Sequence, residues 1–286
     1  AGAVALTGAK IGPVSPTSPV VLVTGATRGI GAATARLFAQ RGARVVVGAR
    51  SADKLDRLVA ELSAAGAEAK AVPADLADPN NAAPLVDAAV AAFGRLDVLV
   101  NNAGYGAQRR FQDMPLAELS RMFAVNVVSV MALAAAAVRV MLPQRSGRIL
   151  NVASVGGVVA HPLNVAYCAT KHAVVGYSKS LRLELRGTGI GVTAICAGAT
   201  RTEFFERARA DIPFDTLIDR FAVRPEVVAR AIVAASRRNR AVVFPTWSAW
   251  FLFALDRWLP WLSAAGNVRY RDKVLALAAR TEGERG

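Results

Sequence analysis

The sequence predicts an α/β fold in which a doubly wound parallel sheet forms a single domain. Short runs of β-branched residues alternate with alanine-rich helical stretches, the order that places parallel strands between crossover helices. Several of these runs are apolar throughout, as strands buried on both faces require. The chain has 286 residues, of which 53% are hydrophobic. This is enough for one sizeable core and too few for two catalytic domains.

The expected elements alternate from residue 20 onward. Strands are predicted at Val20–Val23, Arg44–Val47, Glu68–Val72, Val98–Val100, Arg148–Val152 and Val192–Ile195, with a last strand at Ala241–Pro245. Helices are predicted near Gly31–Arg41, Ser51–Ala65, Ala82–Phe93, Pro115–Leu142 and Asn164–Leu185. In such a sheet, ligands bind outside the carboxyl ends of the strands. Residues that directly follow the strands are therefore the candidates for function.

Three segments are expected along the chain. Residues 1–19 carry prolines that interrupt any helix and lack the pattern of a targeting signal, so we interpret them as a flexible lead-in. Residues 20–245 form the catalytic domain, and residues 246–286 form a helical extension. No segment is expected to span a membrane, because the nearest candidate, Ala241–Leu255, contains a proline and is followed by charged residues.

Composition limits the partners and the compartment. The formal charge of +14 would suit a nucleic acid, but the chain has no Cys/His finger, no basic helix with heptads and no basic-aromatic ribonucleoprotein motif. We therefore expect no nucleic-acid partner; a phosphate-rich cofactor or an anionic membrane surface fits the charge equally well. Cys168 and Cys196 have neither metal-ligand nor disulfide spacing, so a cytoplasmic protein without a metal is predicted.

A glycine-rich turn follows the first strand and leads directly into a helix. Glycines allow a tight turn and let backbone N–H groups approach a pyrophosphate, which the positive end of the helix attracts. Any strand-turn-helix junction can use glycines, but the strand before this turn and the helix after it indicate a Rossmann-type dinucleotide site. The turn consists of Thr24, Gly25, Ala26, Thr27, Arg28, Gly29, Ile30 and Gly31.

The spacing Thr-Gly-x-x-x-Gly-x-Gly resembles the short-chain dehydrogenase/reductase family, and four further segments agree with it. These are Asp75-Leu76, Asn101-Asn102-Ala103-Gly104, the pair Asn126 and Ser154, and Tyr167 to Lys171. After the sixth strand the family's Pro-Gly-x-Val/Ile-x-Thr becomes Ala197-Gly198-Ala199-Thr200-Arg201-Thr202, and loss of the proline is expected to loosen this turn. The resemblance implies cofactor contacts at Thr24, Gly25, Thr27, Arg28, Gly29, Ile30, Gly31, Arg50, Asp75, Leu76, Asn102, Ala103, Gly104, Lys171, Gly198, Thr200 and Thr202.

The end of the second strand predicts which cofactor is used. NAD-binding folds place an acidic residue there to hold the ribose 2′-hydroxyl, whereas this chain has Gly48-Ala49-Arg50-Ser51. Arg50 and Arg28 would clamp a 2′-phosphate through charge-assisted bonds, while a carboxylate would repel that group. We therefore predict NADP(H). The alternative is that both arginines are solvated surface residues.

The family resemblance also implies a catalytic set of Asn126, Ser154, Tyr167 and Lys171. Carbonyl reduction needs an acid for the forming alkoxide and a donor to polarise the carbonyl. Tyr167 and Lys171 share a helix face four residues apart, so the ammonium can stabilise the phenolate. Ser154 would donate to the substrate oxygen, and Asn126 would hold a water that links Lys171 to solvent. Alone, such a Tyr-x-x-x-Lys pair is usually only a helix surface.

The C-terminal segment carries all four tryptophans, Trp247, Trp250, Trp258 and Trp261. Spacings of three and four predict one helix with a single aromatic stripe. The stripe either packs on the domain or a sister subunit, covers the substrate mouth, or lies on a membrane surface; we favour peripheral membrane contact through residues 247–263. This tail resembles the retinol and 11β-hydroxysteroid dehydrogenase branch. Residues 203–222 would form an apolar lid, and His161 could line the mouth.

The predicted function is hydride transfer between NADP(H) and a carbonyl or alcohol of a lipophilic small molecule, in a homo-oligomer. One alternative is a non-catalytic NADP(H)-binding sensor or scaffold, against which the intact catalytic set speaks. A second is a sugar epimerase or dehydratase. The glycine spacing and the chain length disfavour it, because that branch of the family has a larger C-terminal domain.

Overall fold

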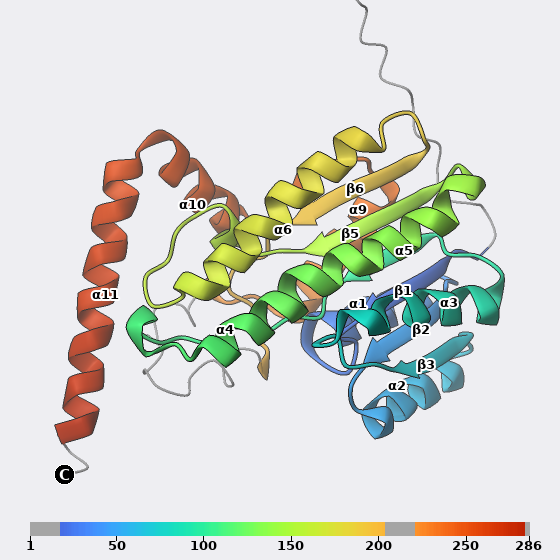
Figure 1. The fold of residues 1–286 in the computed structure, drawn as a ribbon, viewed down its shortest axis with the longest axis horizontal. Coiled ribbons are helices and arrows are strands. Elements are labelled where there is room, and N and C mark those ends of the chain that lie inside the picture. The colour runs from blue at the N-terminus through green and yellow to red at the C-terminus, as the bar shows by residue number, and fades with distance from the viewer. Residues whose placement is uncertain (1–17, 204–220, 284–286) are drawn as a thin grey trace, which may run out of the picture.

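The structure, a computed structural model, describes residues 18–203 and 221–283. A seven-stranded sheet forms its centre, with the order β3-β2-β1-β4-β5-β6-β7 and every neighbouring pair parallel (Figure 1). The fold class predicted from sequence is confirmed. The lead-in up to residue 17 and residues 204–220 of the expected lid lie outside the described residues.

The strands lie close to their predicted positions. They are β1 Val20–Thr24, β2 Arg44–Ala49, β3 Ala69–Pro73, β4 Val98–Asn101, β5 Gly147–Val152, β6 Ile190–Ile195 and β7 Val242–Val243. The chain order reverses at β1, whose two neighbours are β2 and β4. A crevice for ligands opens at such a reversal, outside the carboxyl ends of the two diverging strands.

Helices cover both faces of the sheet. One face carries α1 Gly29–Ala39, α2 Ala52–Ala64 and α9 Pro225–Arg237; the other carries α3 Ala82–Phe93, α5 Ser129–Gln144 and α6 Val165–Glu184. Within β1, Val21 and Val23 join the first core, while Val20 and Leu22 join the second. All four side chains are fully buried, which contributes about 1.5–3 kcal/mol for each of them. The helix α9 was not predicted from sequence.

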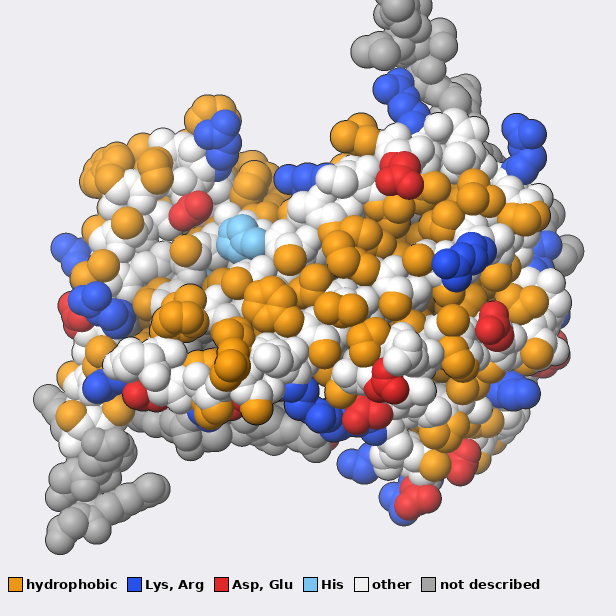
Figure 2. All heavy atoms as spheres, in the orientation of Figure 1, with side chains coloured by type: hydrophobic (Ala, Val, Ile, Leu, Met, Phe, Trp, Pro, Cys, Tyr) orange, Lys and Arg blue, Asp and Glu red, His pale blue; other side chains and the backbone are white. Residues whose placement is uncertain are grey.

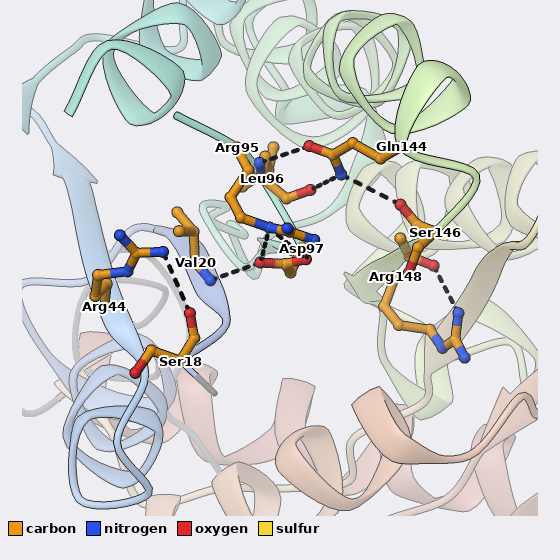
Figure 3. Close-up of polar contacts among 10 residues, drawn as sticks. Ser18, Val20, Arg44, Arg95, Leu96, Asp97, Gln144, Ser146 and Arg148 are labelled. Carbon is orange, nitrogen blue, oxygen red and sulfur yellow. Dashed lines mark hydrogen bonds and ion pairs between the residues drawn. The ribbon is translucent and has the colours of Figure 1, made fainter. Parts of the chain in front are cut away.

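A polar network closes the amino-terminal edge of the sheet (Figure 3). Asp97 is buried there, accepts a bond from the Val20 N–H at 2.9 Å and pairs with Arg95 at 2.7 Å. Gln144, at the end of α5, donates to the Leu96 carbonyl at 2.8 Å and accepts from the Leu96 N–H at 3.2 Å. These bonds tie β1, β4 and α5 together at the edge opposite the ligand crevice.

The long helix predicted for Pro115–Leu142 contains an irregular turn. It comprises α4 Leu116–Phe123, a π-helical turn Ala124–Val128 and α5. By length and composition, the helical stretch Leu116–Gln144 is long and apolar enough to cross a membrane. The prediction that Ala241–Leu255 is the nearest candidate was therefore wrong. Half of the most apolar 18-residue part of this stretch is buried inside the protein. Since α5 packs on α3, β4 and β5, its apolar residues serve the core.

The C-terminal segment forms two helices rather than one. α10 spans Trp247–Trp258, Leu259 leaves the helical conformation, and α11 spans Pro260–Gly283. Proline disfavours a helical residue before it and cannot donate to the preceding turn. The prediction of one helix with a single stripe was therefore wrong, and Trp261 lies on a different helix from Trp247, Trp250 and Trp258. In Figure 1, α10 and α11 form a bent arm beside the sheet domain.

Candidate functional site

The glycine-rich turn connects β1 to α1. Gly25 and Gly29 adopt φ angles of +63° and +52°, a region that residues with a Cβ rarely adopt. A Cβ at Gly31 would lie 2.3 Å from the Gly25 carbonyl oxygen, so this glycine is required for close packing. No side chain caps the N-terminus of α1. Its free N–H groups and the bare turn fit the pyrophosphate of a dinucleotide.

The segment after β4 is bonded to this turn. The Thr24 hydroxyl accepts from the backbone N–H groups of Asn102 and Ala103, both at 3.0 Å. In return the Asn102 side chain donates to the carbonyls of Thr24 at 2.9 Å and Gly25 at 3.2 Å. These hydrogen bonds join the two segments at the point where the strand order reverses. All four residues that they connect, Thr24, Gly25, Asn102 and Ala103, are predicted cofactor contacts.

The segment 197–202 reaches the same turn from β6. Thr200 pairs with Val223, and the Arg201 N–H donates to the Val223 carbonyl at 2.8 Å. The Thr200 hydroxyl is buried and donates to the Gly198 carbonyl at 3.0 Å. Thr202 packs closely on Gly29: a Cβ added to Gly29 would lie only 2.9 Å from the methyl group of Thr202. The segment is therefore tied down by backbone bonds, although the family's proline is missing.

The two arginines expected at the 2′-phosphate have different surroundings. Arg28 pairs with Glu203 at 2.7 Å, and Arg50 is exposed at the end of β2. Both charges remain within reach of solvent, as phosphate binding requires. A phosphate bound by Arg28 would have to replace the Glu203 carboxylate as the partner of the guanidinium. Sequence reasoning missed Glu203, because nothing in the pattern indicates this contact.

The predicted cofactor contact Asp75-Leu76 follows β3. Asp75 pairs with Arg121 of α4 at 3.3 Å and accepts from the Ala77 N–H at 3.0 Å. Leu76 is buried in the core between α3 and the sheet. Asp75 remains at the surface of the crevice, where its carboxylate is already engaged by Arg121.

Tyr167 and Ser154 come from different elements and meet above the end of β5. Ser154 directly follows this strand, and its hydroxyl accepts from the Gly156 N–H at 3.1 Å. Tyr167 lies in the first turn of α6. Burial raises the pKa of the Tyr167 phenol, and the hydrogen bond with Ser154 acts in the opposite direction by a smaller amount. A phenol in these surroundings is protonated at neutral pH and can donate its proton.

Lys171 lies one helical turn after Tyr167 and is almost fully buried. Its ammonium donates to the Val152 carbonyl at 2.9 Å and lies 5.7 Å from the centre of the Tyr167 ring. Burial lowers the pKa of Lys171 to about 8. A Cβ at Gly104 would lie 3.5 Å from Lys171 Nζ and 3.1 Å from Asn126 Oδ1, so this predicted cofactor residue borders the lysine.

Asn126 lies in the π-helical turn between α4 and α5, a feature that often marks a functional site. Its side chain is fully buried and bonds the backbone of Tyr105 twice, at 3.0 and 2.8 Å. It also donates to the Thr170 hydroxyl at 3.1 Å. The amide thereby fixes α6 against the segment after β4. Tyr105 and Thr170 were missed in the sequence, because only their position in space reveals the contact.

His161 lies beside this set. A Cβ at Gly156 would be 3.6 Å from both the His161 ring and the Ser154 hydroxyl. Burial lowers the pKa of His161, while a hydrogen bond with Asn267 of α11 opposes that shift. The structure thus places His161 between Ser154 and the C-terminal helix α11, and its place at the substrate mouth stays a prediction. The described residues contain no group of three His, Cys, Asp or Glu side chains that could hold a metal.

Comparisons with known proteins agree with this geometry. A family model described as short chain dehydrogenase matches residues 19–213. A 3-oxoacyl-[acyl-carrier-protein] reductase from Synechocystis is 39% identical over 196 residues, which cover 68% of this chain and 79% of that protein. The match to the family model ends before α9, so it does not include α10 and α11.

Two solved structures share the fold. A putative NAD(P)-dependent gluconate 5-dehydrogenase from Beutenbergia cavernae with bound NADP has a TM-score of 0.75 and 33% identity, over 84% of this chain and all of that one. A Burkholderia phymatum short chain dehydrogenase/reductase in complex with NAD has a TM-score of 0.77 and 28% identity, over 84% of this chain and 93% of that one. The chain therefore belongs to the short-chain dehydrogenase family and is an oxidoreductase with a nicotinamide dinucleotide site.

Proposed function

We propose that this protein reduces a ketone or aldehyde group on a lipophilic small molecule with NADPH, through Tyr167, Ser154 and Lys171. The observation that carries the proposal is the contact between the Tyr167 phenol and the Ser154 hydroxyl, above a buried lysine. A non-catalytic sensor needs only the glycine turn and the arginines, and it has no use for a buried ammonium beside a phenol.

The chain's own residues would perform the acid-base part of this reaction. Bound NADPH supplies the hydride. Ser154 and Tyr167 donate hydrogen bonds to the carbonyl oxygen, which polarises it and stabilises the developing negative charge. Tyr167 then transfers its proton to that oxygen, and the Lys171 ammonium stabilises the phenolate that remains. Alcohol oxidation is the reverse of these steps.

Asn126 takes a positioning role in this scheme. Its amide already bonds the Tyr105 backbone and Thr170, and the Thr170 hydroxyl donates to the Tyr167 carbonyl at 2.7 Å. Through these bonds it holds the first turn of α6 in place. Proton supply through a water beside Asn126 and Lys171 stays part of the proposal.

Preference for NADPH rests on Arg28 and Arg50. Both arginines lie at the positions where the family holds the ribose phosphate, and the end of β2 carries no carboxylate to bind a 2′-hydroxyl. Among three matched structures, two contain NADP or NADPH and one contains NAD, so the proposal of NADPH rests on the arginines of this chain.

The lipophilic substrate is supported by the type of relative. Granaticin polyketide synthase putative ketoacyl reductase 1 from Streptomyces violaceoruber is 41% identical over 202 residues, which cover 69% of this chain and 73% of that protein. Ketoacyl groups carry a carbonyl on an apolar chain, and we include such compounds in the proposed substrate class. Resemblance to the retinol and hydroxysteroid branch stays a hypothesis.

A homo-oligomer and peripheral membrane contact complete the proposal. Apolar side chains of α5 and α6, among them Met131, Leu142 and Leu183, are exposed, and Figure 2 shows hydrophobic atoms across the surface of these helices. This face suits a second copy of the chain. Membrane contact would use residues 247–263 instead, so the two associations do not compete for one surface.

The direct test is turnover of a carbonyl panel with NADPH and with NADH. The panel contains 3-oxoacyl thioesters, cyclic ketones and aldehydes of increasing chain length, and the loss of reduced-cofactor absorbance is followed. We expect turnover with NADPH that improves as the apolar chain lengthens. NADPH binding without turnover of any carbonyl would favour the sensor and refute the proposal.

A further inference from the structure

The inner side of the α10–α11 arm is fixed to the segments around the catalytic residues. Thr246 caps α10 by accepting from the Ala249 N–H at 3.3 Å. Ala249 is buried against Val155, which directly follows Ser154, and against Val159, five residues after Ser154. The first turn of α10 is therefore anchored beside the active site.

The helix α11 packs across the two segments that flank Tyr167. Val274 is fully buried against Leu163, and Tyr270 lies 3.5 Å from the Gln108 amide. The two segments are themselves joined, because the Arg109 N–H donates to the Leu163 carbonyl at 2.9 Å. Together with the His161–Asn267 bond, these contacts hold α11 against the segments that lie next to Ser154 and Tyr167.

The outer side of the arm exposes an unusual set of aromatic rings. The tryptophans are exposed by 75% at Trp247, 56% at Trp250, 76% at Trp258 and 69% at Trp261, and Phe251, Leu252, Leu259 and Leu262 are exposed beside them. We call these eight residues the aromatic patch. Figure 2 shows hydrophobic side chains and a basic side chain where α10 meets α11. Soluble monomers seldom expose large contiguous apolar surface without a partner for it.

Basic side chains lie within the aromatic patch and further along α11. The Arg257 guanidinium lies over the Trp258 ring at 5.5 Å, and Arg269, Arg271 and Lys273 are exposed along α11. The two nearby acids are engaged: Asp256 accepts from the Ser263 hydroxyl at 2.7 Å, and Asp272 pairs with Arg271. Residues 247–273 contain Arg257, Arg269, Arg271 and Lys273 but only Asp256 and Asp272 as acids, so the formal charge of this stretch is positive, which complements an anionic surface.

Geometry and composition favour lipid over protein as the occupant. α10 has 12 residues, about 18 Å of helix at about 1.5 Å per residue, which is too short to cross a bilayer of about 30 Å. It can instead lie at the interface, where tryptophan and arginine place apolar bodies in lipid and polar groups in water. A second copy of the chain already has a suitable face on α5 and α6.

We propose that the aromatic patch docks on an anionic lipid surface, and that a lipophilic substrate enters the site from that surface under α11. The second half of this proposal rests on the proposed function, whereas the docking half does not. The arm then has two tasks, because its outer side binds lipid while its inner side borders the entrance to Tyr167.

Vesicle flotation tests the docking. The full chain should float with vesicles of phosphatidylcholine and phosphatidylglycerol, float less with phosphatidylcholine alone, and float less again at high salt because screening weakens the cationic contacts. Trp250→Ser with Trp258→Ser should abolish flotation. The control is Leu116→Ser, which removes a side chain that is 76% exposed and lies outside both the arm and the α5–α6 face.

The docking proposal fails if the wild-type chain stays at the bottom of the gradient. It also fails if the tryptophan variant floats like the wild type, or if the tryptophan variant instead loses its oligomeric state in size-exclusion chromatography. The melting temperature of the tryptophan variant should match that of the control, since exposed rings contribute little burial. A clear fall would mean that the rings are packed against protein in solution.

Substrate entry is tested by kinetics with anionic vesicles present. For a long-chain ketone dissolved in the vesicles, the tryptophan variant should show a KM raised about 10-fold, a loss of the size that removal of two anchoring rings produces, with kcat unchanged. A short water-soluble ketone should show no difference. Equal changes with both ketones would refute entry from lipid. Absence of turnover with every carbonyl would instead refute the reductase, while flotation still decides the docking.

Discussion

The two edges of the sheet bury charged groups in different ways. At the amino-terminal edge, Asp97 is buried with an arginine partner and a backbone donor. At the carboxyl edge, Lys171 is buried with the Val152 carbonyl as its bonding partner, and no ion pair joins it to a carboxylate among residues 18–203 and 221–283. The first arrangement compensates the cost of burial, and the second does not.

This difference distinguishes a buried charge that stabilises the fold from a buried charge that serves the reaction. A compensated pair such as Asp97 and Arg95 holds elements in register. A buried ammonium without a carboxylate partner lowers the stability of the fold. Its presence therefore indicates that the charge has a role in the reaction. The lowered pKa of Lys171 and the raised pKa of Tyr167 have the same cause, burial. A strongly perturbed pair in a cleft indicates a functional site.

The largest effect is expected at Tyr167. Tyr167→Phe keeps the ring and removes the proton that the carboxyl edge is built to deliver, so kcat should fall about 1,000-fold, within the range of general acid catalysis. The dissociation constant of NADPH, measured by fluorescence titration, should stay unchanged. Tyr177→Phe on the same helix is the control and should keep full turnover. Equal turnover in the two variants would disprove the assignment of Tyr167.

A smaller effect is expected for cofactor preference at the same edge. Arg50→Asp removes a phosphate partner and adds a carboxylate, so the ratio of kcat/KM for NADPH over NADH should fall about 100-fold, as expected for loss of a charge-assisted contact. Arg57→Asp, an exposed arginine on α2 with the same change of charge, should leave the ratio unchanged. A wild-type protein that prefers NADH would contradict the role of Arg28 and Arg50.

The amino-terminal edge should respond in stability alone. Asp97→Asn weakens the bonds to Val20 and Arg95, and should lower the free energy of unfolding by roughly 2 kcal/mol, because a buried donor loses its partner. Turnover of the folded protein should persist at a temperature well below the melting point. Asp87→Asn, an exposed position on α3, is the control. A loss of turnover without a loss of stability would break the comparison between the two edges.

Much of the scaffold could be predicted because its signals are local. The apolar runs gave all seven strands, and the glycine turn indicated the dinucleotide site before any contact was known. Gly25 and Gly29 have positive φ angles, so their presence follows from the turn itself. The same holds for Tyr167 and Lys171, whose spacing of four places them on one helix face.

Contacts between distant segments could not be predicted. The pairing of Arg28 with Glu203 joins residues that lie 175 positions apart, and the contacts of Asn126 with Tyr105 and Thr170 depend on a π-helical turn that no local pattern indicates. The helix breaks between α10 and α11 at Pro260, and the regular spacing of the tryptophans does not indicate this break. In each case, tertiary packing or a single proline outweighed the periodic pattern.

The smallest expected effect on stability gives the most direct test of the central claim, that burial of Lys171 serves function at the expense of stability. Lys171→Met replaces the ammonium by an apolar group of similar length, and it should remove turnover yet raise the melting temperature of the cofactor-free protein by about 3 °C, the equivalent of about 1 kcal/mol.

The pH dependence of the difference in melting temperature shows whether burial of the Lys171 charge causes it. The pKa of Lys171 is about 8 in the folded protein and about 10.5 in the unfolded chain. Below pH 8 both states carry the charge and the folded state bears the full cost of burying it. Between pH 8 and 10.5 the unfolded chain binds the extra proton, so wild-type stability rises relative to the variant. Melting curves of both proteins from pH 6.5 to 9.5 should show the advantage of Lys171→Met largest below pH 8 and shrinking above it. A variant that melts below the wild type at pH 7 would contradict the account.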